Sequence, residues 1–146
     1  MMKVALGSDH AGFELKEAAK EVLEEMGVEY NDLGVHSYKR VDYVPYGKEV
    51  ALGVADGKYD RGILFCGSGI GMSIVANKIA GIRAALCHEP YTARLSREHN
   101  DANVLVLAGR TTGPGIAAEI IRVWLTTPFA GGRHQKRLDQ VKELEK

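Results

Sequence analysis

Short apolar runs alternate with segments of helical periodicity along the 146-residue chain. Largely apolar runs typical of buried strands occur at 4–6, 62–66, 82–87 and 104–108, and a weaker run occurs at 28–33. Apolar residues recur every three or four positions at 15–26, 45–56, 70–79, 90–100, 114–124 and 134–146. The pattern therefore predicts five strands, each followed by a helix, and a last amphipathic helix at the C-terminus.

Strands that alternate with helices and are apolar on both faces indicate a parallel sheet covered on both sides, because parallel neighbours need crossover helices. We expect one domain over residues 1–146, since the sequence contains no internal repeat or linker. The predicted fold is α/β: a three-layer Rossmann-like sandwich with a five-stranded parallel sheet in the order 2-1-3-4-5 and an added C-terminal helix.

In this order the chain reverses direction between strands 1 and 3. Ligands of such sheets bind at the carboxyl ends of the strands beside the reversal. The loops at 8–12 and 66–71 are therefore expected to meet there and to form the binding crevice.

A glycine-rich turn, CGSGIG, begins at Cys66 after the strongest predicted strand. Glycines at 67, 69 and 71 leave backbone N–H groups free to face an anion at a helix N-terminus, although a tight packing turn is the alternative. Gly71 is followed by Met72 and Ser73, which excludes a P-loop, and the third glycine comes too early for a dinucleotide fingerprint. A cysteine phosphatase loop would need arginine where Met72 stands.

What remains is a thiol at a helix N-terminus. The helix dipole and nearby N–H groups favour the thiolate, so Cys66 could act as a general base. An inert cysteine at the end of a buried strand is the alternative.

Composition narrows the possible partners. Lysine plus arginine and aspartate plus glutamate each number 19, so no net charge draws the chain to nucleic acid or to an anionic membrane. No signal peptide or membrane-spanning stretch is apparent. Cys66 and Cys87 match neither a metal-binding pair nor a disulfide framework, so we expect a cytoplasmic protein whose phosphate recognition is local.

Two pairs of polar residues occupy places where chemistry is possible. Asp9-His10 directly follows the first predicted strand and could move protons or bind phosphate, although Asp9 could equally cap the next helix. His99-Asn100 ends a predicted helix, where a histidine is commonly only a partner of the helix dipole.

Arg133 and Arg137 open the last predicted helix. They are four residues apart, so they project from one face and could hold a phosphate together. Cations at this end oppose the helix dipole unless an anion is bound, which favours a functional reading over a solvated basic face.

Five separated blocks together resemble type B ribose-5-phosphate isomerases, a family related to galactose-6-phosphate isomerase subunits. The similarity runs essentially end to end, and the blocks are Gly7-Ser8-Asp9-His10-Ala11-Gly12, Cys66-Gly67-Ser68-Gly69-Ile70-Gly71, Ala76-Asn77-Lys78, His99-Asn100-Asp101-Ala102-Asn103 and Gly131-Gly132-Arg133-His134. The resemblance implies interconversion of ribose 5-phosphate and ribulose 5-phosphate without a metal or cofactor. It also implies a homodimer or dimer of dimers whose active sites are shared between subunits.

The resemblance further implies roles for the matching residues. Cys66 is expected to move a proton between C1 and C2 of the sugar, with the hydroxyl of Ser68 beside the shuttling oxygens. His99 is expected to open the sugar ring with help from Asp9. The enediolate would be stabilised by the backbone of Gly67, Ser68, Gly69, Ile70 and Gly71.

Other matching residues are expected to bind the substrate. Asn100 would hold sugar hydroxyls across the subunit interface, and the resemblance implies that His10, Arg110, Arg133 and Arg137 contact the substrate and its phosphate. Two departures concern the pocket: many family members have threonine where Ser68 stands, and the proline of a usual Asp-Tyr-Pro segment is displaced to Pro45, which could reshape the rim. Val75 is apolar where some members lacking the cysteine recruit a glutamate base, which favours the thiol version.

Several functions remain open from the sequence. Within the same chemistry the substrate could be a six-carbon aldose 6-phosphate of the allose or galactose type, or an unphosphorylated rare sugar. A nucleotide-binding regulatory module belongs to a different class, since doubly wound folds host many functions. A third possibility is that residues 134–146 form a helix that mainly docks a partner.

Overall fold

The computed structural model describes residues 1–145, and every predicted strand and helix is present there. The strands are β1 (Lys3–Ser8), β2 (Glu29–Asp32), β3 (Arg61–Cys66), β4 (Ala84–Leu86) and β5 (Val104–Ala108). The helices are α1 (Phe13–Met26), α2 (Tyr43–Ala55), α3 (Ile70–Asn77), α4 (Pro90–Glu98), α5 (Pro114–Thr126) and α6 (Arg133–Glu143). Residue 146, to which the last predicted helix extended, lies outside the described residues.

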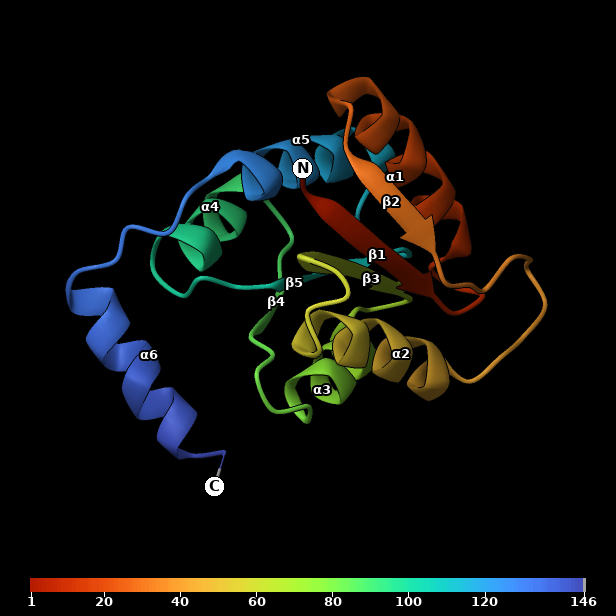
Figure 1. Cartoon of the computed structure of the whole chain (residues 1–146). Coiled ribbons are helices and arrows are strands. Elements are labelled where there is room, and N and C mark those ends of the chain that lie inside the picture. Colours follow the sequence, from red (N-terminus) through yellow and green to blue (C-terminus); the bar gives the residue numbers. More distant parts are fainter. Residues whose placement is uncertain (146) are drawn as a thin grey trace.

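The five strands form one parallel sheet between two layers of helices (Figure 1). Helices α1, α4 and α5 pack together on one face, and α2 packs with α3 on the other. This arrangement confirms the predicted three-layer Rossmann-like α/β fold. Among residues 1–145, no helix has the length and apolar character needed to cross a membrane.

The observed strand order is β2-β1-β3-β5-β4, so the predicted order 2-1-3-4-5 is wrong at one edge. All five residues of β5 are fully buried, whereas β4 has three residues and each is half-buried. The more apolar strand therefore lies inside the sheet and the short one at its edge. Because right-handed crossovers then run in opposite directions, α3 and α4 cover opposite faces.

Successive side chains of the central strands point to opposite faces of the sheet and belong to two separate hydrophobic cores. Ile63 and Phe65 of β3 belong to the core under α1, α4 and α5, whereas Leu64 and Cys66 belong to the core under α2 and α3. The first core also contains Trp124, which is fully buried. Cys66 is thus the last residue of a strand whose backbone is paired on both sides.

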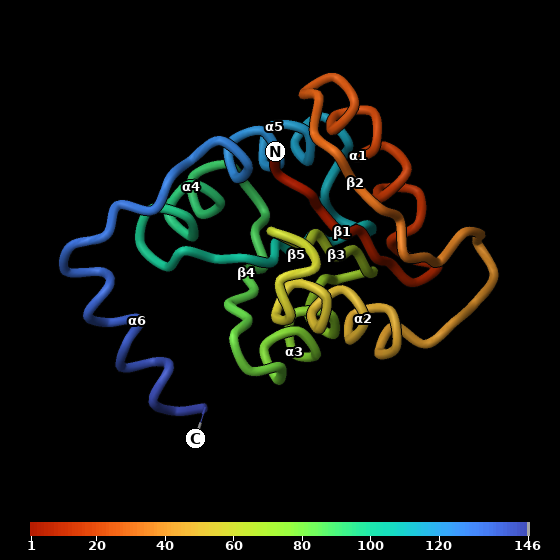
Figure 2. The backbone as a smooth tube through the Cα atoms, viewed as in Figure 1, coloured from red at the N-terminus to blue at the C-terminus, as the bar shows by residue number. Residues whose placement is uncertain are grey.

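The C-terminal helix is the least enclosed element. In Figure 2 α6 extends away from the sheet on the opposite side of the molecule from the loop at 33–42. His134 is its only buried residue, and Val141 and Leu144 are 48% and 83% exposed. The helix therefore leaves apolar surface uncovered in a single chain.

Candidate functional site

The carboxyl ends of three strands meet at one edge of the sheet. Ser8 of β1 pairs with Phe65 of β3, and Cys66 pairs with Ala108 of β5, so the loops after these strands emerge side by side. A Cβ atom added to Gly12 would lie 2.4 Å from the carbonyl of Phe65. The first loop therefore packs directly on β3, and the predicted meeting of loops 8–12 and 66–71 is confirmed.

We call the residues gathered at this edge the Cys66 half-site: Asp9, His10, Cys66, Gly67, Ser68, Gly69, Ile70, Gly71 and Arg110. Cys66 is 4% exposed and ends β3 under the turn. Gly69 has a φ of 81°, a left-handed conformation that turns the chain into α3. The N–H groups of Gly67, Ser68 and Gly69 have no acceptor among residues 1–145, so they remain available beside the thiol.

Asp9 and His10 hold the loop that faces this turn. The Asp9 Oδ1 atom accepts a hydrogen bond of 3.0 Å from the N–H of Gly12, so the carboxylate closes the turn before α1 while Gly12 is the N-cap. His10 Nδ1 accepts from the N–H of Val41 at 3.2 Å. In the neutral ring the proton is therefore on Nε2, which leaves a donor for a substrate.

Two further side chains line the turn. A Cβ atom at Gly67 would lie 3.3 Å from Arg110 Nη1, so the guanidinium lies beside the N–H groups of the turn. A Cβ atom at Gly71 would lie 2.7 Å from the ring of Tyr43 at the start of α2. The sequence interpretation had only identified the segment 42–45 as a rim and assigned no contact to Tyr43.

A buried lysine fixes the loop that reaches His10. Lys16 is fully buried, and its Nζ atom donates to Asp32 Oδ1 at 2.6 Å and to the carbonyl of Val35 at 2.5 Å. Burial alone would raise the pKa of Asp32, but hydrogen bonds from Lys16 and Lys20 hold that pKa below its usual value. Burial lowers the pKa of Lys16, while the hydrogen bond and charge of Asp32 act against that shift. The pair ties α1 to the start of the 33–42 loop.

The remaining predicted site residues lie at the opposite side of the sheet, near the amino ends of the strands. Helix α4 begins after the carboxyl end of β4 and runs back, so its C-cap, His99, lies where β5 begins. The His99 ring stacks on the ring of His134, with centroids 4.2 Å apart and an angle of 14°. The sequence interpretation quoted His134 in a motif but gave it no role, and only the pairing of α4 with α6 reveals one.

We call this second group the His99 half-site: His99, Asn100, Arg133, His134 and Arg137. Arg133 and Arg137 are exposed at the start of α6, whose N-cap is Gly132 and whose first turn contains no acidic residue. Burial, and then the neighbouring His99 and the two arginines, lower the pKa of His134 below its usual 6.5. The group is therefore cationic in character and suited to an anion.

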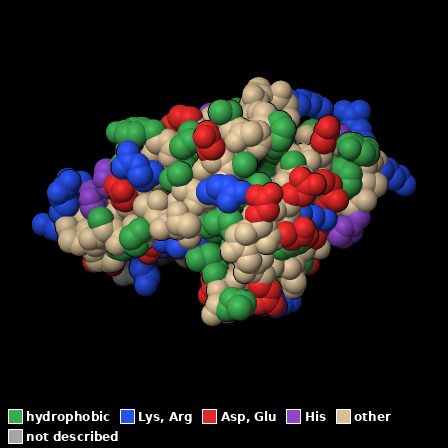
Figure 3. All heavy atoms as spheres, turned by 90° about the horizontal axis from the view of Figure 1, so that it is seen from above, with side chains coloured by type: hydrophobic (Ala, Val, Ile, Leu, Met, Phe, Trp, Pro, Cys, Tyr) green, Lys and Arg blue, Asp and Glu red, His purple; other side chains and the backbone are tan. Residues whose placement is uncertain are grey.

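A single chain thus divides the predicted site into two incomplete parts. The turn that follows Cys66 lies at the carboxyl ends of the strands, whereas α6, which carries His134 and the arginines, begins on the opposite side of the molecule (Figure 1). On the face drawn in Figure 3, charged side chains of both signs intermingle. In the described part of the chain, no three His, Cys, Asp or Glu side chains are grouped to hold a metal ion.

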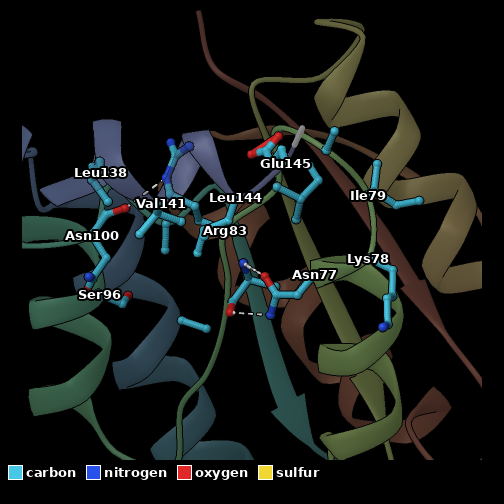
Figure 4. A pocket seen from close by; sticks show the side chains of 15 residues that line it. Asn77, Lys78, Ile79, Arg83, Ser96, Asn100, Leu138, Val141, Leu144 and Glu145 are labelled. Carbon is cyan, nitrogen blue, oxygen red and sulfur yellow. Dashed lines mark hydrogen bonds between the residues drawn. The ribbon is translucent and has the colours of Figure 1, made fainter.

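Two asparagines of the sequence motifs turn out to support the edge strand. Asn77 donates to the carbonyl of Ala84 at 3.0 Å and accepts from its N–H at 2.9 Å (Figure 4). Asn103 accepts from the N–H of Arg83 and donates to the carbonyl of Gly81, both at 2.8 Å. These amides occupy backbone groups that a short edge strand leaves unpaired.

Comparisons with known proteins agree with this geometry. The chain matches the Ribose/Galactose Isomerase family over residues 4–141. It is 50% identical to ribose-5-phosphate isomerase B of Escherichia coli over 99% of this chain and 97% of that protein, and 41% identical to D-erythrulose-4-phosphate isomerase of Pectobacterium atrosepticum over 97% and 93%. The structure of Clostridium thermocellum ribose-5-phosphate isomerase B superposes with a TM-score of 0.97 at 48% identity, covering 99% of this chain and 97% of that one. The chain therefore belongs to the Ribose/Galactose Isomerase family.

Proposed function

We propose that this chain interconverts D-ribose 5-phosphate and D-ribulose 5-phosphate through an enediolate, with Cys66 as the base. The observation that carries the proposal is a thiol at the end of β3 beside three N–H groups that have no acceptor among residues 1–145. The names of the relatives support the same substrate. A base beside oxyanion donors is the pair of functions that a 1,2-proton transfer requires.

At the Cys66 half-site the reaction balances without an added reagent. The thiolate removes the proton from C2 of the open-chain aldose, and the electron pair moves to the carbonyl oxygen on C1 to give the enediolate. The resulting thiol returns the proton to C1, and the hydroxyl proton moves from the oxygen on C2 to the oxygen on C1. The N–H groups of the turn stabilise the intermediate charge, and Ser68 lies beside the two oxygens.

The other steps require the second group of residues. Ring opening needs a proton donor, for which His99 is suited with help from Asp9, while Asn100 holds sugar hydroxyls. Arg133 and Arg137 bind the phosphate together with His10 and Arg110. Because one chain holds the two half-sites at opposite ends of its strands, the proposal includes a homodimer or dimer of dimers in which each complete site takes one half-site from each copy.

The uncovered apolar surface of α6 supports this assembly. Leu138, Val141 and Leu144 face a hollow of about 710 Å³ between α6 and the end of α3 (Figure 4). A monomer gains nothing from exposing this surface, whereas a second copy could bury it. The docking role that the sequence suggested for 134–146 is then part of the isomerase and does not compete with it.

The sugar is tested by comparing specificity constants. The family description includes galactose isomerases, and one relative is named for a four-carbon ketose phosphate. We expect kcat/KM to be highest for ribose 5-phosphate among the phosphates of ribose, allose, galactose and erythrulose. A preference of tenfold or more for a six-carbon or four-carbon sugar would reassign the substrate while keeping the mechanism.

A nucleotide-binding module is tested by thermal shift. A ligand present at 100 times its Kd stabilises the folded chain by about 2.7 kcal/mol, which is readily measured as a rise in Tm. Ribose 5-phosphate is expected to raise Tm, and NAD and ATP are not. The reverse result would contradict the isomerase proposal.

A further inference from the structure

Two arginines form hydrogen bonds with the turn that carries His99 and Asn100. Arg97, which is 5% exposed, donates from Nη1 to Asp101 Oδ1 at 2.9 Å and to the carbonyl of Ala102 at 2.6 Å. From the other side Arg83 donates through Nε to the carbonyl of Asn100 at 3.0 Å (Figure 4). It also donates through Nη2 to the carbonyl of Asp101 at 2.9 Å. These arginine contacts therefore supplement the backbone hydrogen bonds that end α4.

Asp101, which lies between the two arginines, has an unusual backbone conformation. Its φ of 46° lies in the left-handed region, which glycine adopts most easily and aspartate tolerates. Its carboxylate bridges the two arginines, with Oδ1 bonded to Arg97 and Oδ2 3.5 Å from Arg83 Nη2. The backbone alone would favour glycine, so the contribution specific to aspartate is this bridge.

Arg97 also connects the turn to the segment that leads to α6. Its Nε atom donates to the carbonyl of Thr127 at 3.2 Å, just after α5. The N–H of Ala130 donates to the carbonyl of Glu98 at 3.0 Å, so the same helix end receives the linker to α6. One buried side chain thus holds together the two segments that supply the His99 half-site.

We propose that Arg97 and Asp101 are positioning residues that set the geometry in which one chain presents His99 and Asn100 to a second copy. The inference rests on the proposed function, in which this half-site completes the Cys66 half-site of the partner. Neither residue needs to contact the sugar. They act by adding side-chain restraints to a turn that the backbone hydrogen bonds at the end of α4 would hold less tightly alone.

The first test is the substitution Asp101→Gly, which keeps the left-handed backbone favourable while removing the bridge. A misplacement of about 1 Å in a catalytic group costs up to 100-fold in rate, so we expect kcat to fall about tenfold. KM should rise by less than kcat falls, because Asn100 shifts with the turn while the arginines of α6 are untouched. The matched control is Arg94→Ala: Arg94 also lies on α4 and pairs with an acidic residue four positions on, Glu98, at 3.3 Å, and its loss should leave kcat unchanged.

The second test uses Arg97→Met in mixed dimers, because loss of a buried arginine could also lower stability. Two differently tagged chains, one carrying Arg97→Met and one Cys66→Ala, are expressed together and the mixed dimer is isolated by both tags. One of its two sites then combines an intact Cys66 half-site with an intact His99 half-site. We expect about half of the wild-type kcat, far above either parent dimer.

The outcomes separate this inference from the function on which it rests. A mixed dimer of Cys66→Ala and His99→Asn chains is the control for sharing of the site. If that control recovers activity but the Arg97→Met pair does not, Arg97 acts on the whole chain and the positioning role is wrong. Wild-type kcat in Asp101→Gly would also overturn it. If the control pair itself stays inactive, the shared site is wrong and this inference fails with it.

Discussion

The Cys66 half-site and the His99 half-site are built in different ways. Cys66 ends a central strand that is paired on both sides, and glycines allow the neighbouring loops to pack directly on that strand. His99 instead caps a helix, stacks on a residue of the exposed helix α6, and depends on arginine contacts to backbone carbonyls. The sheet therefore holds the proposed base rigidly, whereas we expect the second half-site to be more easily displaced than the fold itself.

The largest expected effect is that of Cys66→Ala. Loss of a general base typically costs 100- to 10,000-fold, and we expect kcat to fall by about 1,000-fold while ribose 5-phosphate still binds. Turnover is measured by formation of the ketose, and binding by thermal shift. Residual turnover above a tenth of the wild-type value would show that another group is the base.

Lys16→Met tests how much the buried lysine that fixes the 33–42 loop contributes to stability. The substitution leaves the buried carbonyl of Val35 without its donor and Asp32 paired with the partly exposed Lys20 instead of a buried cation, and we expect a loss of about 2 to 3 kcal/mol in the free energy of unfolding. Lys20→Met is the matched control: Lys20 also binds Asp32 but is partly exposed, so its loss should cost less than about 1 kcal/mol. Equal losses in urea denaturation would mean that burial of Lys16 does not distinguish the two.

Loss of either arginine proposed to bind the phosphate, Arg133 or Arg137, is expected to have a smaller effect on activity. Each of Arg133→Ala and Arg137→Ala should remove a charge-assisted contact worth about 1.5 kcal/mol and lower kcat/KM about tenfold, mainly through KM. The matched control is Lys136→Ala, on the same exposed turn of α6. A similar loss in the control would indicate a general effect of charge on this surface.

The smallest effect is a pH dependence of the histidine stack. Since the pKa of His134 is below 6.5 in the folded chain, the unfolded chain binds more protons just below that pH, and stability rises with pH there. The contribution of His134 is complete above 6.5 and is lost as pH falls through the folded pKa. Between about pH 7.5 and 5.5, the Tm of the wild-type chain should therefore fall more than that of His134→Gln. Parallel curves would contradict this.

The sequence predicted the elements well because their apolar periodicity is local. The order of β4 and β5 could not be predicted in this way, since periodicity identifies both 82–87 and 104–108 as strands without saying which is central. Arg83 interrupts the first run, and in the structure β4 has only three residues, each half-buried. The start of α2 at Tyr43, two residues before Pro45, reflects a first turn that tolerates proline.

The site was predictable in part for the same reason. The turn after β3 and the pair after β1 follow buried strands, so their meeting could be inferred from topology. The contacts of Tyr43 with Gly71 and of His134 with His99 join segments far apart in the sequence. The spacing of residues along the chain therefore does not predict them. The roles of His99 and Arg110 came only from the family resemblance, because each alone looks like an ordinary helix end or loop residue.

The most direct test of the account is the activity of a mixed dimer that combines a Cys66→Ala chain with a His99→Asn chain. Each parent dimer lacks one half-site in both copies and should be nearly inactive. In the mixed dimer one of the two shared sites is whole, so we predict about half of the wild-type kcat. A mixed dimer as inactive as its parents would contradict the claim that each site takes one half from each copy.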